Sequence, residues 1–366
     1  MRAIWEHVDA MRDAEVTRTV ADRQRLLRHE VEDYLRGESL ALPERQAKLW
    51  QRDYSSVEAY LESVQPNRER WLAAIGHFTR PQPAPQPEWS PFLEDDLVQA
   101  RWLTLPFLGE LRARAVLGLP KQGRPPHPLV VAQHGIGSSP ERVFGFDDPG
   151  NVYHAYGRRL VEAGYAVLAP MNVTEVRPRS RLNRLCLMLG GTLWGLEVAR
   201  TSLLLDYLET RDDLDFERTA MWGISLGGAY TMFTLPLEPR LKAAVVTAWF
   251  NDRVRKMVVD DPRYSCFLST EEEYVFIPGW LREFGDSDLV SLICPRPVQV
   301  QTGKGDGIAW WPLVVEEFER SVQHYRRLGL GERIELDLHE GGHEIDLQGG
   351  LAFLNRWLGA GGSMVG

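Results

Sequence analysis

The sequence predicts an α/β fold, a mostly parallel sheet flanked by helices, with an N-terminal helical arm and a cap insertion. From about residue 96 onward, short apolar runs alternate with longer segments of helical periodicity. A run such as 128–133 is almost entirely apolar, which is typical of a strand buried on both faces of a parallel sheet. Strands that alternate with helices build a parallel sheet, because each crossover helix returns the chain to the same edge.

Residues 1–80 are predicted to form a separate helical arm. Leu27, Val31 and Leu35 recur at helical spacing, and Asn67 is expected to cap a further helix. Such an arm would act either as a lid over the main domain or as a contact between copies of the chain. The sequence leaves both roles open, and the second would make the protein a homo-oligomer.

A stiff connector is expected at residues 81–95, because Pro81-Gln-Pro-Ala-Pro-Gln-Pro87 can form neither a regular helix nor a central strand. The main domain is expected at residues 96–360, with a cap inserted at about 249–290. Its strands are predicted at 97–107, 111–119, 128–133, 165–169, 219–223, 242–247, 297–301 and 333–338. Its helices are predicted at 153–163, 193–209, 227–234, 314–327 and 351–357.

Composition excludes several classes of function. The 366 residues carry a formal net charge of -9, so no nucleic-acid partner is expected. No apolar run approaches the roughly 20 residues that span a bilayer, so no membrane association is expected. Glu6, Asp9 and Asp13 stand where a secretory signal would be apolar, which favours a cytoplasmic protein. The three cysteines are expected to be reduced and buried.

The motif Gly223-Ile-Ser225-Leu-Gly227 lies between a predicted strand and a predicted helix. This arrangement is typical of a nucleophile elbow, in which a tight turn strains the serine backbone and aims its Oγ out of the sheet. The positions two before and two after the serine must lack a Cβ, because strand and helix would otherwise collide. Ser225 is therefore predicted to be the nucleophile of a serine hydrolase.

A serine hydroxyl is a weak nucleophile at neutral pH, so it needs a base and an orienting acid. Behind an elbow of this kind, the acid and then the histidine follow in chain order. Three histidines follow Ser225. His324 falls within a predicted helix and is interpreted as a surface residue, whereas His339 and His343 come after the last strand. His343 is the predicted base, because it follows two glycines in a turn beyond that strand.

Asp306 is the predicted acid, since it lies in the turn that follows the next-to-last strand. There it could hold the imidazole tautomer and stabilise its protonated form. Asp286 and Asp288 precede that strand and are the alternatives. The oxyanion hole is expected to use the backbone N–H groups of Leu226 and Ile136, which follow two strands of the sheet.

The segment His339-Glu-Gly-Gly-His343 also matches the H-E-x-x-H pattern of zinc proteases. That pattern needs a helix, which places both imidazoles on one face. Here a predicted strand leads directly into the segment, and each central glycine would cost a helix about 1 kcal/mol. No metal is therefore expected at this segment.

These motifs resemble those of the dienelactone-hydrolase and acetyl-xylan-esterase-like branch of the α/β-hydrolase superfamily, over about residues 96–360. The resemblance implies the α/β-hydrolase fold, the triad Ser225, Asp306 and His343, and no cofactor. Carboxylic esters, often small acyl groups on sugars, are typical substrates of that branch. The chain departs from the pattern after the acid, where residues 307–312 stand in place of an early proline. The supporting segments are Asp206-Tyr-Leu-Glu through Gly228, Pro239 to Ala244, Cys294 to Val298, Gly305-Asp306 and Gly341 to Glu344.

The expected reaction is hydrolysis of a small-molecule ester through an acyl-enzyme. A serine peptidase or amidase would use the same triad, and a lyase or a non-catalytic binding protein could share the fold. These alternatives stay open. Trp249 and Trp280 of the cap, with Trp310 after the acid, are expected to line the substrate pocket. Residues 172–184 are interpreted as a solvated, arginine-rich loop, with recognition of an acidic substrate as the alternative.

Overall fold

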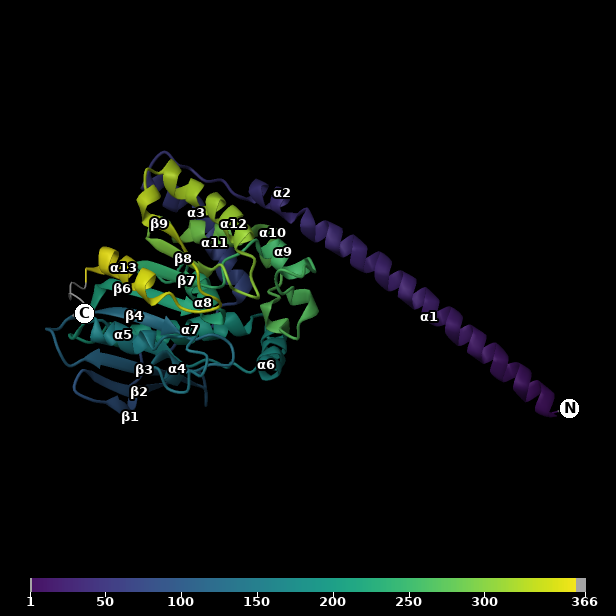
Figure 1. Ribbon diagram of the computed structural model, residues 1–366, viewed down its shortest axis with the longest axis horizontal. Coiled ribbons are helices and arrows are strands. Elements are labelled where there is room, and N and C mark those ends of the chain that lie inside the picture. The colour runs from purple at the N-terminus through teal and green to yellow at the C-terminus, as the bar shows by residue number, and fades with distance from the viewer. Residues whose placement is uncertain (1, 360–366) are drawn as a thin grey trace.

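Nine strands form one mixed sheet, and helices cover both of its faces (Figure 1). The computed structural model describes residues 2–359, and within them the side chains of residues 13–359. The strands are β1 (Glu88–Glu94), β2 (Val98–Pro106), β3 (Arg112–Pro120), β4 (His127–Gln133), β5 (Ala166–Pro170), β6 (Leu214–Ile224), β7 (Ala243–Thr247), β8 (Val298–Gly303) and β9 (Ile334–His339). The α-helices are α1 (Arg2–Leu40), α2 (Leu42–Gln46), α3 (Val57–Ile75), α4 (Pro140–Val143), α5 (Tyr156–Glu162), α6 (Val176–Met188), α7 (Leu193–Leu208), α8 (Leu226–Thr234), α9 (Arg253–Val258), α10 (Trp280–Glu283), α11 (Asp286–Ile293), α12 (Trp311–Arg327) and α13 (Leu347–Leu358). Short 3-10 turns are η1 (Ala47–Leu49), η2 (Phe267–Ser269), η3 (Glu273–Val275) and η4 (Gly331–Arg333).

The strand order is β1-β2-β3-β5-β4-β6-β7-β8-β9. β1, β2 and β3 pair antiparallel, and so do β3 and β5, whereas every neighbouring pair from β5 to β9 is parallel. Carboxyl ends of parallel strands meet at one edge of a sheet, so the loops after β4, β6, β8 and β9 gather there. The predicted class, a mostly parallel sheet between helices, is confirmed.

Apolar side chains fill one layer on each face of the sheet. Strands β4 and β5 are buried along their whole length, which accounts for their nearly continuous apolar sequence. Trp194 of α7 and Phe233 of α8 belong to the layer on one face. Tyr156 of α5 and Leu354 of α13 belong to the layer on the other.

Helix α3 packs into the body and contributes to its core. Val64 and Trp71 are completely buried, and the Trp71 indole donates a hydrogen bond to the carbonyl oxygen of Phe233 (3.1 Å). The sequence predicts that Asn67 caps a helix, but the structure shows that it does not. It lies inside α3, where its amide donates to Glu283 Oε1 (2.6 Å). The predicted start of a helix at Asn67 is therefore wrong, because α3 begins at Val57 and continues through this position.

Two other segments differ from the sequence-based expectation. Residues 88–94, assigned to the connector, form the edge strand β1 and pair with β2. Residues 172–184, expected to be a loop, include most of helix α6. Both segments contain proline or charged residues that weaken the usual signals of strand and helix.

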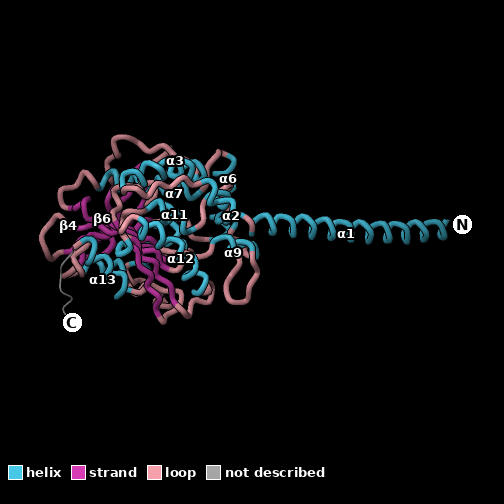
Figure 2. Tube along the Cα trace, turned by 90° about the horizontal axis from the view of Figure 1, so that it is seen from above, coloured by secondary structure: helices cyan, strands magenta, loops and turns pink. Residues whose placement is uncertain are grey.

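Helix α1 extends away from the body as a single helix of 39 residues (Figures 1 and 2). Its last turns are fixed to the body by Arg36, which donates to the carbonyl oxygen of Val258 and to Asp260 Oδ2 (3.1 Å). The projecting element is thus α1, while α3 belongs to the body. Despite its length α1 is rich in charge, and within residues 2–359 no helix has the apolar span needed to cross a bilayer.

An insertion between β7 and β8 contains α9, η2, η3, α10 and α11. Lys256 of α9 connects it to the loop after β8, because its ammonium donates to Ser265 Oγ (2.6 Å) and to the carbonyl oxygen of Ile308. The Ser265 N–H donates to the same carbonyl (3.3 Å). The expected cap therefore contacts the loop that carries Asp306.

Candidate active site

Ser225 occupies the tight turn between β6 and α8. Its backbone angles, φ 57° and ψ -120°, lie outside the regions that L-residues normally adopt. The Ser225 N–H donates to the carbonyl oxygen of Thr247 at the end of β7 (2.9 Å), which holds the strained turn against the neighbouring strand. Strain of this kind is a feature of functional sites.

Crowding around the turn explains its two glycines. A Cβ on Gly223 would lie 2.2 Å from the carbonyl oxygen of Gly227. A Cβ on Gly227 would lie 2.1 Å from the carbonyl oxygen of Gln133 in β4. The predicted steric requirement for glycine at both positions is confirmed.

Asp306 and His343 form a direct pair. His343 Nδ1 lies 2.8 Å from Asp306 Oδ2, and the carboxylate is fully buried while the imidazole is 29% exposed. The second carboxylate oxygen accepts the Ile308 N–H (2.9 Å). Because Nδ1 contacts Asp306, Nε2 is the imidazole nitrogen that could exchange a proton with another group.

The loops that carry this pair are joined by backbone hydrogen bonds. Gly305 N–H donates to the carbonyl oxygen of Gly341, and Lys304 N–H to that of His339 (both 2.9 Å). A Cβ on Gly303 would lie 2.2 Å from the carbonyl oxygen of Gly342, so the two loops approach too closely for a side chain. The glycines on both sides thus permit the contact between acid and base.

The environment of Asp306 keeps its carboxylate charged. Burial acts to raise the pKa, but the hydrogen bond and charge of His343, the Ile308 N–H and the Lys256 ammonium outweigh it and hold the pKa below its usual value. Burial lowers the pKa of Lys256 to about 8, with the Arg253 charge acting in the same direction. A carboxylate can stabilise a protonated imidazole only while it is itself ionised.

The three predicted residues follow strands of one parallel set. Ser225 follows β6, Asp306 follows β8 and His343 follows β9, so all three lie at the same edge of the sheet. One strand, β7, separates β6 from β8. The structure brings Asp306 and His343 into contact, and it leaves Ser225 half-buried at the edge they share.

The loop after β4 lies directly beside the nucleophile. A Cβ on Gly135 would lie 3.3 Å from Ser225 Cβ. Gly135 N–H donates to Tyr153 Oη (2.9 Å), and Gly137 N–H donates to the carbonyl oxygen of Thr174 (3.0 Å). Between them, the N–H of Ile136 makes no hydrogen bond to any residue that the structure describes.

Leu226 is the first residue of α8. Its N–H likewise donates to no acceptor within the described part of the chain, as is usual for the first turn of a helix. Two unpaired N–H groups, from Ile136 and Leu226, thus flank Ser225. They fit the expected oxyanion hole, since an oxyanion needs donors that are not already engaged.

The alternative acids make other contacts. Asp286 is fully buried in an ion pair with Arg253 (2.7 Å) and also accepts the Asn251 N–H (3.0 Å). Asp288 pairs with Arg52 of the segment before α3 (2.5 Å). These two carboxylates stabilise the packing of the insertion and of the N-terminal segment.

The other histidines also have partners away from Ser225. His324 is half-buried, with its Nδ1 2.6 Å from Tyr54 Oη, so the interpretation as a surface residue is wrong. Burial lowers the pKa of His324 to about 3. His339 Nδ1 accepts the Gly341 N–H (3.2 Å) at the end of β9. His134 is completely buried, and burial lowers its pKa to about 4.

The segment 339–343 does not form a helix. It ends strand β9 and continues as a turn, so its two imidazoles do not share a helical face. Within the described residues no cluster of three metal-ligating side chains occurs. The Nδ1 atoms of the two imidazoles instead contact the Gly341 N–H and the Asp306 carboxylate.

The three tryptophans predicted to line the pocket have different surroundings. Trp280 is buried against Trp71 and Phe233, which are the contacts of a core residue. Trp249 is half-buried and follows β7, with the Arg253 guanidinium 4.2 Å from its ring centre. Trp310 is also half-buried, and it immediately precedes α12.

The arginines of α6 serve different purposes. Arg179 is completely buried, pairs with Glu197 (2.8 Å) and donates to Tyr230 Oη (2.5 Å). Arg177 pairs with Glu271 of the insertion (2.8 Å) at the surface. The expectation of a solvated basic loop is therefore wrong for Arg179.

Sequence reasoning missed a contact that supports the turn carrying His343. His154 Nε2 lies 2.8 Å from Glu344 Oε2, and Glu344 Oε1 accepts the Gly342 N–H (2.8 Å). Glu344 therefore links the turn that carries His343 to a distant loop. Glu344 stands next to His343 in the sequence and could have drawn attention for that reason. Its partner His154, however, lies 190 residues earlier in the chain.

Comparisons with known proteins bear on the fold. No protein-family profile matches the sequence. A Bacillus subtilis protein named "Putative hydrolase YtaP" is 26% identical over 211 residues, which are 56% of this chain and 68% of that protein. The structure of a "putative acetyl xylan esterase" from Bacteroides fragilis superposes with a TM-score of 0.64 at 17% identity, covering 80% of this chain and 78% of that one. A CE15 glucuronoyl esterase from Teredinibacter turnerae gives 0.59 at 16% identity, covering 82% and 86%.

These similarities establish the fold. The chain has the α/β-hydrolase fold, a mostly parallel sheet flanked by helices, as the sequence predicts. The predicted resemblance to acetyl-xylan-esterase-like proteins is confirmed at the level of three-dimensional structure.

Proposed function

We propose that the protein is a serine esterase that hydrolyses carboxylic esters through Ser225, Asp306 and His343. The observation that carries the proposal is the buried Asp306–His343 pair, at 2.8 Å, on the sheet edge where the strained Ser225 turn lies. A carboxylate, an imidazole and a strained serine in this chain order make up the machinery of acyl transfer.

The proposed reaction has two halves. His343 Nε2 takes the proton of Ser225 Oγ as this oxygen attacks the ester carbonyl. The N–H groups of Ile136 and Leu226 bind the oxyanion, and His343 then protonates the leaving alcohol. Water, deprotonated by the same imidazole, hydrolyses the acyl-enzyme and restores Ser225.

Small-acyl esters of carbohydrates are the proposed substrates. The Bacteroides fragilis and Teredinibacter turnerae proteins are named as esterases of acetylated xylan and of glucuronoyl esters, and the Bacillus subtilis relative is named a hydrolase. Trp249 and Trp310 are proposed to contact the substrate, since both are half-buried and follow β7 and β8. One face of each ring is covered by a guanidinium, Arg253 on Trp249 (4.2 Å) and Arg263 on Trp310 (3.7 Å). No residue in the proposed cycle needs a cofactor.

The test compares wild-type protein with Ser225→Ala on p-nitrophenyl esters of increasing acyl length, on p-nitroanilides and on acetylated xylo-oligosaccharides. We expect the wild type to hydrolyse short-chain esters and to be labelled by a fluorophosphonate probe, and the variant to show neither property while keeping its circular dichroism spectrum. Unchanged ester hydrolysis by Ser225→Ala would refute the proposal. Faster cleavage of anilides than of esters would identify an amidase instead.

A further inference from the structure

Helix α1 carries an apolar stripe that the body leaves uncovered. Val16, Val20, Leu27, Val31 and Leu35 are each 48–59% exposed. The stripe repeats after eleven residues, since Val16 is followed by Leu27 and Val20 by Val31. Eleven residues fill about three helical turns, so the stripe runs nearly straight along the helix. Exposed apolar surface of this kind on a projecting helix marks an interaction site.

The spacing of the stripe is the same in both directions. With Gln24, its members stand at positions 16, 20, 24, 27, 31 and 35, which are symmetric about the midpoint between residues 25 and 26. Two copies of this helix, packed antiparallel about a twofold axis at that midpoint, would place Val16 beside Leu35 and Val20 beside Val31. Each stripe is thus complementary to itself, as a twofold interface requires.

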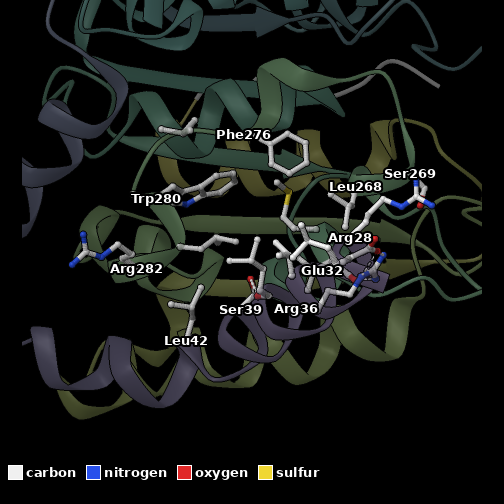
Figure 3. A pocket seen from close by; sticks show the side chains of 18 of the residues that line it. Arg28, Glu32, Arg36, Ser39, Leu42, Leu268, Ser269, Phe276, Trp280 and Arg282 are labelled. Atoms are coloured by element: carbon white, nitrogen blue, oxygen red, sulfur yellow. Dashed lines mark hydrogen bonds and ion pairs between the residues drawn. The ribbon is translucent and has the colours of Figure 1, made fainter. Parts of the chain in front are cut away.

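The body provides a second surface against which such a pair of helices could pack. A groove of about 960 Å³ runs between the second half of α1 and the insertion that contains α9 and α10 (Figure 3). Leu27, Val31 and Leu35 line one side of the groove. Leu268 and Phe276 line the other and are 45% and 38% exposed.

We propose that a second copy of this chain fills the groove with its own α1, so that the protein is an antiparallel, arm-exchanged homodimer. The half of α1 that contains Val16 and Val20 then lies between α1 and the insertion of the other protomer. Both grooves are filled by the same operation, because the contact is twofold symmetric. The proposal concerns assembly and does not depend on the proposed function.

Charges beside the stripe fit the same arrangement. At 100° per residue, Arg23 and Glu30 lie on one flank of the stripe. The antiparallel pairing brings Arg23 of one protomer to within about 3 Å, along the helix axis, of Glu30 on the other. The ion pairs in the described part of α1 join other residues, such as Asp22 with Arg25, so this pair is available to the partner.

The first test measures the mass of the full-length protein by sedimentation equilibrium and light scattering. We expect a dimer for the wild type, and a rise in the dimer Kd on the order of 100-fold for Val31→Asp, because a carboxylate would be buried in the interface. Leu268→Asp should have a similar effect, since the partner helix also packs on the insertion. His29→Asp, on the opposite face of α1, is the matched control and should remain dimeric. A monomeric wild type at 100 µM, or a dimer that Val31→Asp leaves intact, overturns the proposal.

A second test fixes the direction of the helices. Arg23→Glu should weaken the dimer, and the exchange Arg23→Glu with Glu30→Arg should restore it. When Val20→Cys and Val31→Cys proteins are mixed and oxidised, the antiparallel register predicts a crosslink between the two different variants. The three natural cysteines are buried and should not compete. Crosslinks formed only between two copies of the same variant would show a parallel pair and refute the arrangement.

Discussion

Two buried aspartates show how the surroundings of a carboxylate decide its role. Asp286 and Asp306 both have fully buried carboxylates. Burial raises the pKa of Asp286 even though Arg253 opposes this, and the pair links parts of the insertion. In Asp306 the imidazole and backbone contacts outweigh burial and hold the pKa low. Asp306 faces the imidazole of His343, whereas Asp286 faces the guanidinium of Arg253, so of the two carboxylates Asp306 is the one proposed to stabilise an imidazolium.

Asp306→Asn should therefore lower kcat by about 10,000-fold, because an amide favours the wrong imidazole tautomer and cannot stabilise its charged form. Initial rates on p-nitrophenyl acetate measure the effect. Asp288→Asn is the matched control, since its carboxylate pairs with Arg52 away from His343. If Asp288→Asn lost activity and Asp306→Asn kept it, the acid would be wrongly assigned.

The sequence predicts local geometry well where the cause lies within a few residues. The elbow needs two glycines within five residues, so its motif is visible without a structure. Asp306 and His343 were predicted from chain order, because each follows a recognisable strand, and the structure brings the two side chains into contact. The role of Arg179 was not predictable, since its burial depends on Glu197 and Tyr230, which come from other helices.

At the scale of elements, the strands of the parallel sheet were predicted because their apolar runs are continuous. Strand β1 was missed because it is an exposed edge strand that contains Pro91 and follows a proline-rich segment. Helix α3 was predicted to begin at Asn67, because the sequence does not show that this amide has a buried partner in Glu283. Its place in the core could be recognised only from the packing of α7, α8 and α10 around it.

The packing of α3 gives a stability prediction. Trp71 is completely buried against Phe233, Trp280 and Phe284. Trp71→Ala should lower the free energy of unfolding by about 3–5 kcal/mol, since a large cavity would remain. Urea denaturation followed by far-UV circular dichroism measures the change.

Glu62→Ala, at an exposed position of the same helix, should change the free energy of unfolding by no more than about 0.5 kcal/mol. Equal stability of Trp71→Ala and wild type would mean that α3 does not belong to the cooperative core.

Strand β9 and helix α13 meet at a pair of carboxyl groups. Burial, together with the adjacent Asp346, raises the pKa of Asp337 to about 7. Asp337 also accepts a hydrogen bond from Gln301 Nε2 (2.9 Å), and Asp346 caps α13. The folded protein thus retains a proton between pH 4 and 7 that the unfolded chain has lost.

The stability of the wild type should consequently fall as the pH rises from about 4 to 7, relative to Asp337→Asn, which cannot ionise. Urea denaturation of both proteins at intervals of one pH unit tests this. Glu340→Gln, which removes an exposed carboxylate from the neighbouring turn, should give a curve parallel to that of the wild type. A constant difference between wild type and Asp337→Asn across this range would exclude the raised pKa.

At the scale of the whole molecule, two parts are stabilised in different ways. The body has apolar layers on both faces of a nine-stranded sheet. Helix α1 has no such core within the described residues, and its last turns alone are fixed to the body, through Arg36. Long helices gain most of their stability from packing of an apolar face. In the proposed dimer, α1 obtains that packing from the partner.

Melting of α1 should therefore depend on protein concentration, whereas melting of the body should not. Raising the concentration from 1 to 100 µM should move a first, smaller loss of helical ellipticity at 222 nm to higher temperature, because mass action favours the paired arms. Val31→Asp should lower the temperature of this first transition and remove its concentration dependence, leaving the second transition in place. His29→Asp should melt like the wild type. One transition that is independent of concentration in the wild type would mean that α1 is held by the body and not by a second copy.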